Sequence, residues 1–137
     1  HHVPTGAPQR HLILIVKATD ADGRPLSLQD GPMLPEWAGD YAGLPGETYA
    51  KVLEDEWTGE SPTAAYWRPI RLVEDTRIAA FETATSRYGF ALGDGLSEPV
   101  TIEVRLIFRR AFQSLMEMKG WDDPDIVMEE ETLVINK

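Results

Sequence analysis

The protein has 137 residues, with 13 lysines and arginines against 23 aspartates and glutamates, so its formal net charge is -10. This length fits one compact domain, and 42% hydrophobic with 26% charged residues is ordinary globular usage that excludes wholesale disorder. The acidic balance argues against a nucleic-acid binder, and the longest aliphatic run, Leu12 to Val16, is far shorter than the about 20 apolar residues of a membrane span.

The N-terminal third begins with a strong strand pattern and continues into a long loop. His11 to Thr19 is apolar on both faces, which predicts a central strand, and Asp20 to Gly23 has the residues of a turn. Leu26 to Gly46 has no periodicity and many prolines and glycines, so we expect an ordered loop. Four large side chains are expected to anchor this loop on the core: Met33, Leu34, Trp37 and Tyr41.

Three further patterns in the middle of the chain indicate strands. Tyr49 to Trp57 contains good helix formers, yet it favours a strand that ends before Thr58-Gly59. Tyr66 to Val73 is interrupted by Pro69, which predicts an edge strand or a bulge. Thr83 to Leu92 alternates in hydrophobicity and predicts another strand.

The C-terminal third has the clearest periodicity. Thr101 to Arg109 predicts a half-buried antiparallel strand. Its expected core face consists of Ile102, Val104, Leu106 and Phe108. Arg110 to Lys119 has helical spacing and stops at Gly120, a favourable C-terminal residue. Ile126 to Ile135 predicts a final strand, and its change of phase around Glu129 to Glu131 indicates a β-bulge.

These elements predict one all-β domain over residues 1–137. Six or seven strands, one short α-helix and no βαβ alternation favour an antiparallel β-sandwich. Because the chain has no cysteine, it cannot form disulfides, use thiol catalysis or attach haem through a CxxCH motif.

Acidic side chains offer a weak metal site. Asp20 and Asp22 precede Gly23 in the manner of a calcium loop, but Gln29 stands where an EF-hand needs Glu, so a simple hairpin turn is favoured. The acidic residues of Asp122 to Glu131 could also gather a divalent ion, although a solvated acidic face explains them as well. A small hydrolase is not favoured, because only three histidines are present and no nucleophile motif occurs.

Arginine side chains are the candidates for docking to a partner. Guanidinium groups on a strand face pair with carboxylates in bidentate geometry, and three of them lie on or just after the strand Thr101 to Arg109: Arg105, Arg109 and Arg110. Pairing with acids of the same chain is the competing interpretation. The loop Gly31 to Gly46 is the second predicted docking face.

The chain resembles a known family in several separated blocks. His1-His2-Val3-Pro4-Thr5-Gly6, followed by Arg10, resembles the motif GHxxPTG…R that opens the C-terminal β domain of some multihaem c-type cytochromes. The match continues through Asp75-Thr76-Arg77-Ile78, Phe81-Glu82 and Val104 to Phe112, and so covers most of the chain.

The resemblance implies an immunoglobulin-like sandwich that packs against a haem array carried by a preceding segment rich in CxxCH. It implies a non-catalytic domain, exported to the periplasm or the cell exterior, that supports electron transfer and docking of subunits or redox partners. We therefore expect a processed or excised piece of a longer protein, with haem c outside this chain. His2, or less favourably His1, would be a distal ligand to such a haem.

Two alternatives stay open. Spacing alone equally allows His1-His2 to be the end of a purification tag. An extracellular calcium-binding, adhesion or filament-forming β module without a redox role is the alternative function.

Overall fold

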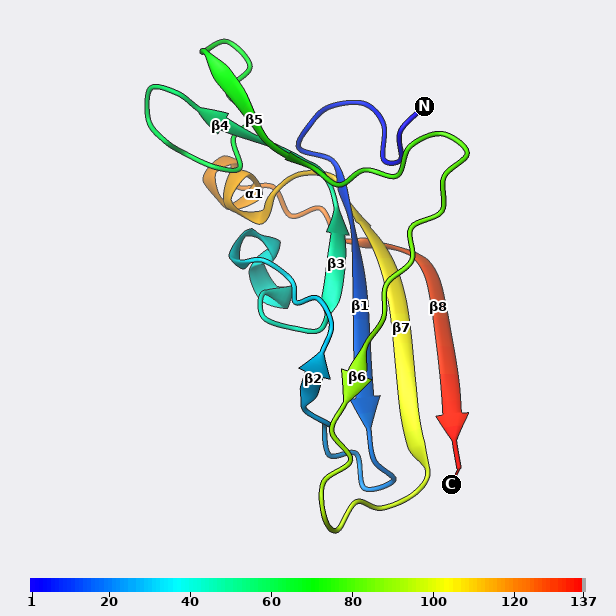
Figure 1. The fold of residues 1–137 in the computed structure, drawn as a ribbon. Coiled ribbons are helices and arrows are strands. Elements are labelled where there is room, and N and C mark those ends of the chain that lie inside the picture. Colours follow the sequence, from blue (N-terminus) through cyan, green and yellow to red (C-terminus); the bar gives the residue numbers. More distant parts are fainter. Residues whose placement is uncertain (137) are drawn as a thin grey trace.

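The computed structural model describes residues 1–136. One four-stranded antiparallel sheet forms the body of the protein (Figure 1). Its strand order is β3-β1-β7-β8. The strands are β1 (His11–Thr19), β3 (Gly46–Tyr49), β7 (Val100–Arg109) and β8 (Ile126–Ile135). β1 lies between β3 and β7 and is buried along nearly its whole length, which confirms the predicted central strand.

Two short antiparallel pairs complete the β structure. β2 (Leu28–Asp30) pairs with β6 (Gly89–Phe90), and β4 (Lys51–Asp55) pairs with β5 (Ile70–Asp75). The helical elements are a 3-10 segment, η1 (Glu36–Tyr41), and a short helix, α1 (Gln113–Lys119). The predicted all-β antiparallel fold with one short α-helix is therefore confirmed.

The hydrophobic core lies on one face of the main sheet, where the long loop covers it. Ile13 and Ile15 of β1 and Ile107 of β7 pack against Leu34 and Ala38 of the loop. The Gln113 side chain at the start of α1 accepts a hydrogen bond from the backbone N–H of Asp40 at 2.9 Å, so α1 and η1 cover this face together. The predicted anchoring of the loop is correct for Leu34, whereas Met33 is exposed.

The opposite face of the sheet is only partly covered. On β1 the side chains of Leu12, Val16 and Ala18 are buried there. The four apolar residues of β7 that were expected to form the core face lie on this side and are only half buried. Val100 is buried on this same face, whereas Glu103 and Arg105 on the other face are exposed, as the alternating pattern predicted. The prediction missed that Ile107 and Arg109 of the other row are also buried, under the long loop.

Several predicted boundaries differ from the structure for local reasons. The strand expected over Tyr49 to Trp57 is divided at Ala50, because β3 pairs with β1 whereas β4 pairs with β5. β5 begins after Pro69, whose ring nitrogen cannot donate to a ladder. Only Gly89–Phe90 of the strand expected over Thr83 to Leu92 pairs with another strand, so that prediction was largely wrong.

The C-terminal predictions are the most accurate. β8 has the predicted bounds, and its register against β7 skips Met128, one residue before the expected bulge. α1 ends at Gly120 in the left-handed conformation that the glycine predicted, although the helix starts at Gln113 instead of Arg110.

Candidate functional site

The three arginines predicted to dock a partner are all paired with acids of their own chain. Arg105 contacts Glu130 at 3.1 Å and Arg110 contacts Asp123 at 2.8 Å, both at the surface. Arg109 binds Asp125 through two hydrogen bonds of 2.8 Å. Local pairing therefore explains these side chains.

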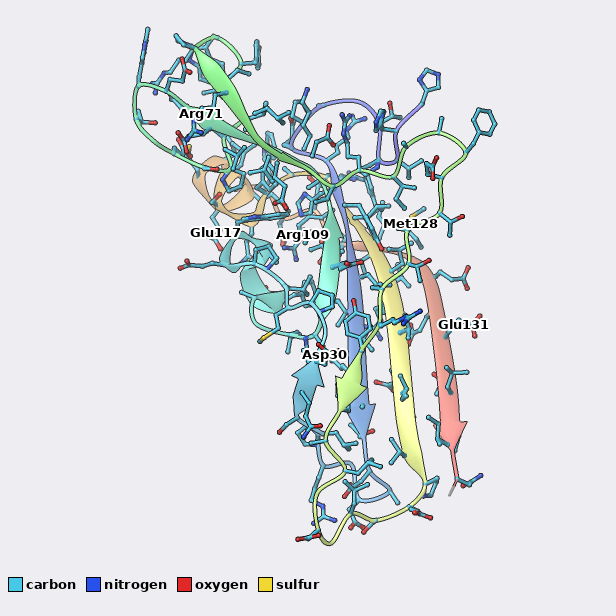
Figure 2. The ribbon with its side chains drawn as sticks, viewed as in Figure 1. Asp30, Arg71, Arg109, Glu117, Met128 and Glu131 are labelled. Carbon is cyan, nitrogen blue, oxygen red and sulfur yellow. The ribbon has the colours of Figure 1, made fainter. Side chains whose placement is uncertain are left out.

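Arg109 is a structural residue and not part of an open surface, because its side chain is buried where three segments meet (Figure 2). Besides Asp125, its guanidinium donates a hydrogen bond of 2.8 Å to the carbonyl of Ala38 and lies 5.1 Å from the ring centre of Tyr41. Burial opposes ionisation of Asp125, but the Arg109 guanidinium holds the pKa of that carboxyl below its usual value. The burial of Arg109 within the chain favours this structural role over the predicted docking role.

A fully buried histidine lies beside Arg109. The His11 ring stacks on Phe112, with ring centres 4.9 Å apart, and meets Trp37 edge to face at 5.5 Å. Its Nδ1–H donates to the carbonyl of Gln9 at 3.0 Å, whereas Nε2 has no hydrogen-bond partner within residues 1–136. Burial lowers the pKa of His11 to about 4, so the ring is neutral at pH 7 and serves as a flat packing group.

Asp20 and Asp22 organise a turn around Arg24. Asp20 Oδ1 accepts hydrogen bonds from the backbone N–H groups of Asp22 and Arg24, and Asp20 Oδ2 accepts one of 2.8 Å from Arg24 Nε. Asp22 contacts Arg24 and the hydroxyl of Ser97. Within the described part of the chain, no third acidic, histidine or cysteine side chain joins them, and the hydrogen bonds present are those of the favoured hairpin turn.

His1 and His2 are exposed at the N-terminus. Val3 forms a two-way backbone bridge to Ile78, with N···O distances of 2.8 and 2.9 Å, so the segment that follows the histidines is fixed to the body. The bidentate Arg77 guanidinium lowers the pKa of Asp75 to about 2, and the charge of His2 adds a smaller effect in the same direction. The two imidazoles are accessible to a ligand or to a second protein.

A long ordered connection between β4 and β5, residues 56–69, was not singled out by the sequence. Asp55 at its start is buried, and its carboxylate accepts hydrogen bonds from Arg68 at 2.7 Å and from the Trp57 backbone at 2.9 Å. Burial disfavours the charge, but the Arg68 hydrogen bond lowers the pKa of Asp55 below its usual value. Backbone bonds from Thr63 to Leu53 and from residue 56 to 69 also fix this connection.

This ordered connection exposes three large aromatic rings. Trp57, Tyr66 and Trp67 are 72%, 82% and 68% exposed, and the rings of Tyr66 and Trp67 meet edge to face at 5.2 Å. On the neighbouring strand β5, Leu72 and Val73 are also exposed. We call these five residues the aromatic surface, which takes in both faces of β5 because the neighbouring Leu72 and Val73 point to opposite sides of the strand. Large apolar groups held open on an ordered backbone are typical of a docking site.

The aromatic surface lies at the same end of the molecule as the N-terminus (Figure 1). Phe81, in the connection that follows β5, is also fully exposed at this end and has a positive φ of 66°, which is rare for a side chain of this size. The signal in the sequence is the adjacent pair Tyr66-Trp67 close to Pro69, in a segment predicted as an interrupted strand.

An open groove of about 580 Å³ lies on the partly covered face, beside β6, β7 and the end of β8. Its walls are mostly apolar, with Tyr88, Phe90 and Ile102 among them. Two carboxylates, Asp94 and Glu98, also line it, without a histidine, lysine or arginine beside them. The groove therefore does not present a paired acid and base.

One solved structure shows the same fold. The crystal structure of a penta-heme cytochrome c552 from Thermochromatium tepidum matches with a TM-score of 0.66 over 98% of this chain, at 22% sequence identity. The likeness shows the fold. The chain spans 33% of that protein. No family model and no curated protein matches the sequence, and none of the described helices is long and apolar enough to cross a membrane.

Proposed function

We propose that this chain is a non-catalytic β domain of a multihaem c-type cytochrome, exported from the cytoplasm, that packs on a haem-bearing segment and supports electron transfer. The observation that carries the proposal is the fold likeness, which covers 98% of this chain but only 33% of a penta-heme cytochrome. The sequence blocks that resemble the C-terminal domain of such cytochromes agree with it.

The residues present do not fit covalent haem attachment, because the chain has no cysteine. Haem c would therefore belong to a segment or subunit outside this chain, where it carries electrons. The imidazoles of His1 and His2 fit an axial ligand to such a haem, because both side chains are exposed at the surface.

The aromatic surface is the face that we assign to contact with the haem-bearing segment. Its apolar rings exclude water from whatever they cover, and removing water from a haem edge is one means by which a protein tunes the haem potential. Burying Trp57 and Trp67 would also supply the aromatic anchors that dominate the energy of protein contacts.

Absorption spectroscopy of the natively purified protein tests the proposal. We expect a Soret band to copurify with the wild-type chain and to be lost when Trp57 and Trp67 are both replaced by Ser. Trp121→Ser is the matched control, because Trp121 is half exposed and lies beyond α1. A colourless native preparation would overturn the proposal in favour of a β module without a redox role.

The axial-ligand assignment has its own test. Replacement of His1 and His2 by Ala in the haem-containing assembly should convert one haem from a low-spin to a high-spin spectrum, while the Soret band still copurifies. An unchanged low-spin spectrum would remove the two histidines from the haem site and leave the docking proposal intact.

A further inference from the structure

The strand β8 ends the main sheet and leaves one edge open. Among residues 1–136 its ladder partner is β7 alone, and Figure 1 shows no element on its outer side. All ten side chains of β8 are exposed. Figure 2 labels Met128 and Glu131 along this edge. The outer backbone N–H and C=O groups of a ten-residue strand are thus available to another chain.

The side chains of β8 are arranged as two apolar ends around an acidic centre. The exposed apolar residues at the two ends are Ile126, Val127, Met128, Leu133, Val134 and Ile135. Between them stand Glu129, Glu130 and Glu131. An added strand would cover apolar side chains at both ends and meet carboxylates in the middle.

The register against β7 separates the three glutamates by face. Glu130 lies opposite Arg105 and forms an ion pair with it at 3.1 Å. Glu129 and Glu131 lie on the other face, opposite Leu106 and Val104, which offer no positive charge. Neither carboxylate forms an ion pair with any residue from 1 to 136. Two free negative charges therefore stand two residues apart in an apolar row.

A second copy of β8 would fit this edge poorly. Full antiparallel pairing of two β8 strands would place Glu130 opposite Glu131 and Glu129 opposite Thr132, so six carboxylates would lie together. Like charges directly across a strand pair are destabilising. Each copy also has a net charge of -10, which adds long-range repulsion.

We propose that the β8 edge binds an extended segment of a partner protein that carries two basic residues two positions apart, with apolar residues on either side. The segment adds as a fifth strand to the sheet. Its two cationic side chains contact Glu129 and Glu131, and its apolar side chains cover Ile126 and Leu133 on the same face. Backbone hydrogen bonds give affinity, and the central charge pair sets the register.

The test uses the full chain and synthetic twelve-residue peptides in fluorescence anisotropy. The probe alternates Val and Thr and has Lys at two central positions two residues apart, and the matched peptide has Glu at those positions. We expect the lysine peptide to bind and the glutamate peptide to fail. Raising the salt concentration from ~20 to ~300 mM should markedly weaken binding of the lysine peptide, because exposed charge pairs are screened.

Substitutions on the strand locate the contact. Glu129→Gln together with Glu131→Gln should weaken binding of the lysine peptide about five- to tenfold, the loss expected for two exposed ion pairs. Glu130→Gln is the matched control on the same strand, and we expect less than about a twofold change because its carboxylate faces the other side.

Two further peptides test addition to the strand. Each is the lysine peptide with alternate residues N-methylated, one along one backbone edge and the other along the opposite edge. An added strand uses the N–H groups of one edge, so we expect one of the two peptides to lose binding. Binding that survives both N-methylated peptides, equal binding of the glutamate peptide, or reversible dimerisation of the chain that needs the β8 edge would overturn the proposal.

Discussion

His11 and Arg109 show how two polar side chains can serve a hydrophobic core. They stand opposite each other on β1 and β7, on the face that the long loop covers. His11 is satisfied at one nitrogen and contributes its flat ring to an aromatic cluster, whereas Arg109 is satisfied by Asp125 and a carbonyl. Both residues connect the sheet to the segments that cover it.

The buried His11 predicts a loss of stability in mild acid. The unfolded chain takes up a proton at this ring below pH 6.5, but the folded chain does so only near pH 4, so the stability falls as the pH drops between these values. The full loss is about 3 kcal/mol, from a pKa lowered from 6.5 to about 4. Urea unfolding of wild type and His11→Phe from pH 7 to 4 measures it.

In His11→Phe the free energy of unfolding should fall by about 3 kcal/mol less between pH 6.5 and 4 than in the wild type, because phenylalanine takes up no proton. At pH 7 this variant should lose about 1 kcal/mol with the hydrogen bond to Gln9. His2→Gln is the control and should retain the wild-type profile, since His2 is exposed. An unchanged profile in His11→Phe would mean that other groups cause the acid loss.

Arg109 gives a prediction about the pairing of buried charge. Arg109→Ala should lower the free energy of unfolding by about 3 kcal/mol, because it leaves a partly buried carboxylate of Asp125 without its partner. Arg110→Ala removes an ion pair that is open to water and should change stability by about 0.5 kcal/mol or less. Equal effects of the two substitutions in chemical denaturation would contradict the structural role of Arg109.

At the scale of elements, the close approach of β3 to β1 depends on a residue without a side chain. A Cβ at Gly46 would meet the carbonyl of Leu14 and the side chain of Leu34. The backbone of Gly46 is not in the left-handed region, so the requirement here is space and not conformation.

Gly46→Ala should therefore destabilise the protein by about 2 kcal/mol through overpacking. Gly93→Ala is the matched control, because no atom lies within 4 Å of its added Cβ and its φ is not positive. We expect that variant to stay within about 0.5 kcal/mol of wild type in thermal unfolding. A tolerated Gly46→Ala would show that β3 can shift away from β1.

Periodicity predicted an element well where the faces that the fold covers are the faces that the sequence makes apolar. β1 is apolar on both faces, and it is covered on both faces. β7 alternates, and the strand was predicted, but alternation cannot tell which row is covered more deeply. The predicted row is half buried along its length, but the loop also covers Ile107 and Arg109 of the other row, which the alternation did not indicate.

The candidate site was harder to predict, because it depends on which groups meet. Nothing local in Arg109 or Asp125 shows that they pair, since 16 positions separate them. The aromatic surface escaped prediction for the same reason: Trp57 and Trp67 are as apolar as core residues, and only the fold shows that they stay exposed. Gly120 and the β8 bounds were correct because turn chemistry and strand periodicity are local.

At the scale of the whole molecule, the covering of the sheet is uneven. The loop and α1 close one face, and the other face carries the short β2–β6 pair, the connection that leads from β5 to β6, and an open groove (Figure 1). The β4–β5 pair and its aromatic surface project from one end, and β8 forms one edge (Figure 1). The apolar surface left open is concentrated at these peripheral elements, where we propose that partners bind.

This arrangement predicts a gradient of local stability. Amide hydrogens of β1 lie between two ladders and under side chains that are nearly all buried, so they should exchange only by global unfolding. Amides of β5 that pair with β4 should exchange at least about 100-fold faster, since all six β5 side chains are exposed and the pair stands apart from the main sheet. Hydrogen exchange followed by mass spectrometry measures this gradient.

The same measurement relates local stability to docking. If the aromatic surface covers a haem-bearing segment, protection in β5 should rise towards that of β1 when the chain is in its native assembly, while protection in β1 changes little. Equal protection of β1 and β5 in the isolated chain would contradict the gradient. A gradient that persists unchanged in the assembly would contradict the assignment of the aromatic surface as the contact, because burial of those rings must slow the opening of the strand that carries them.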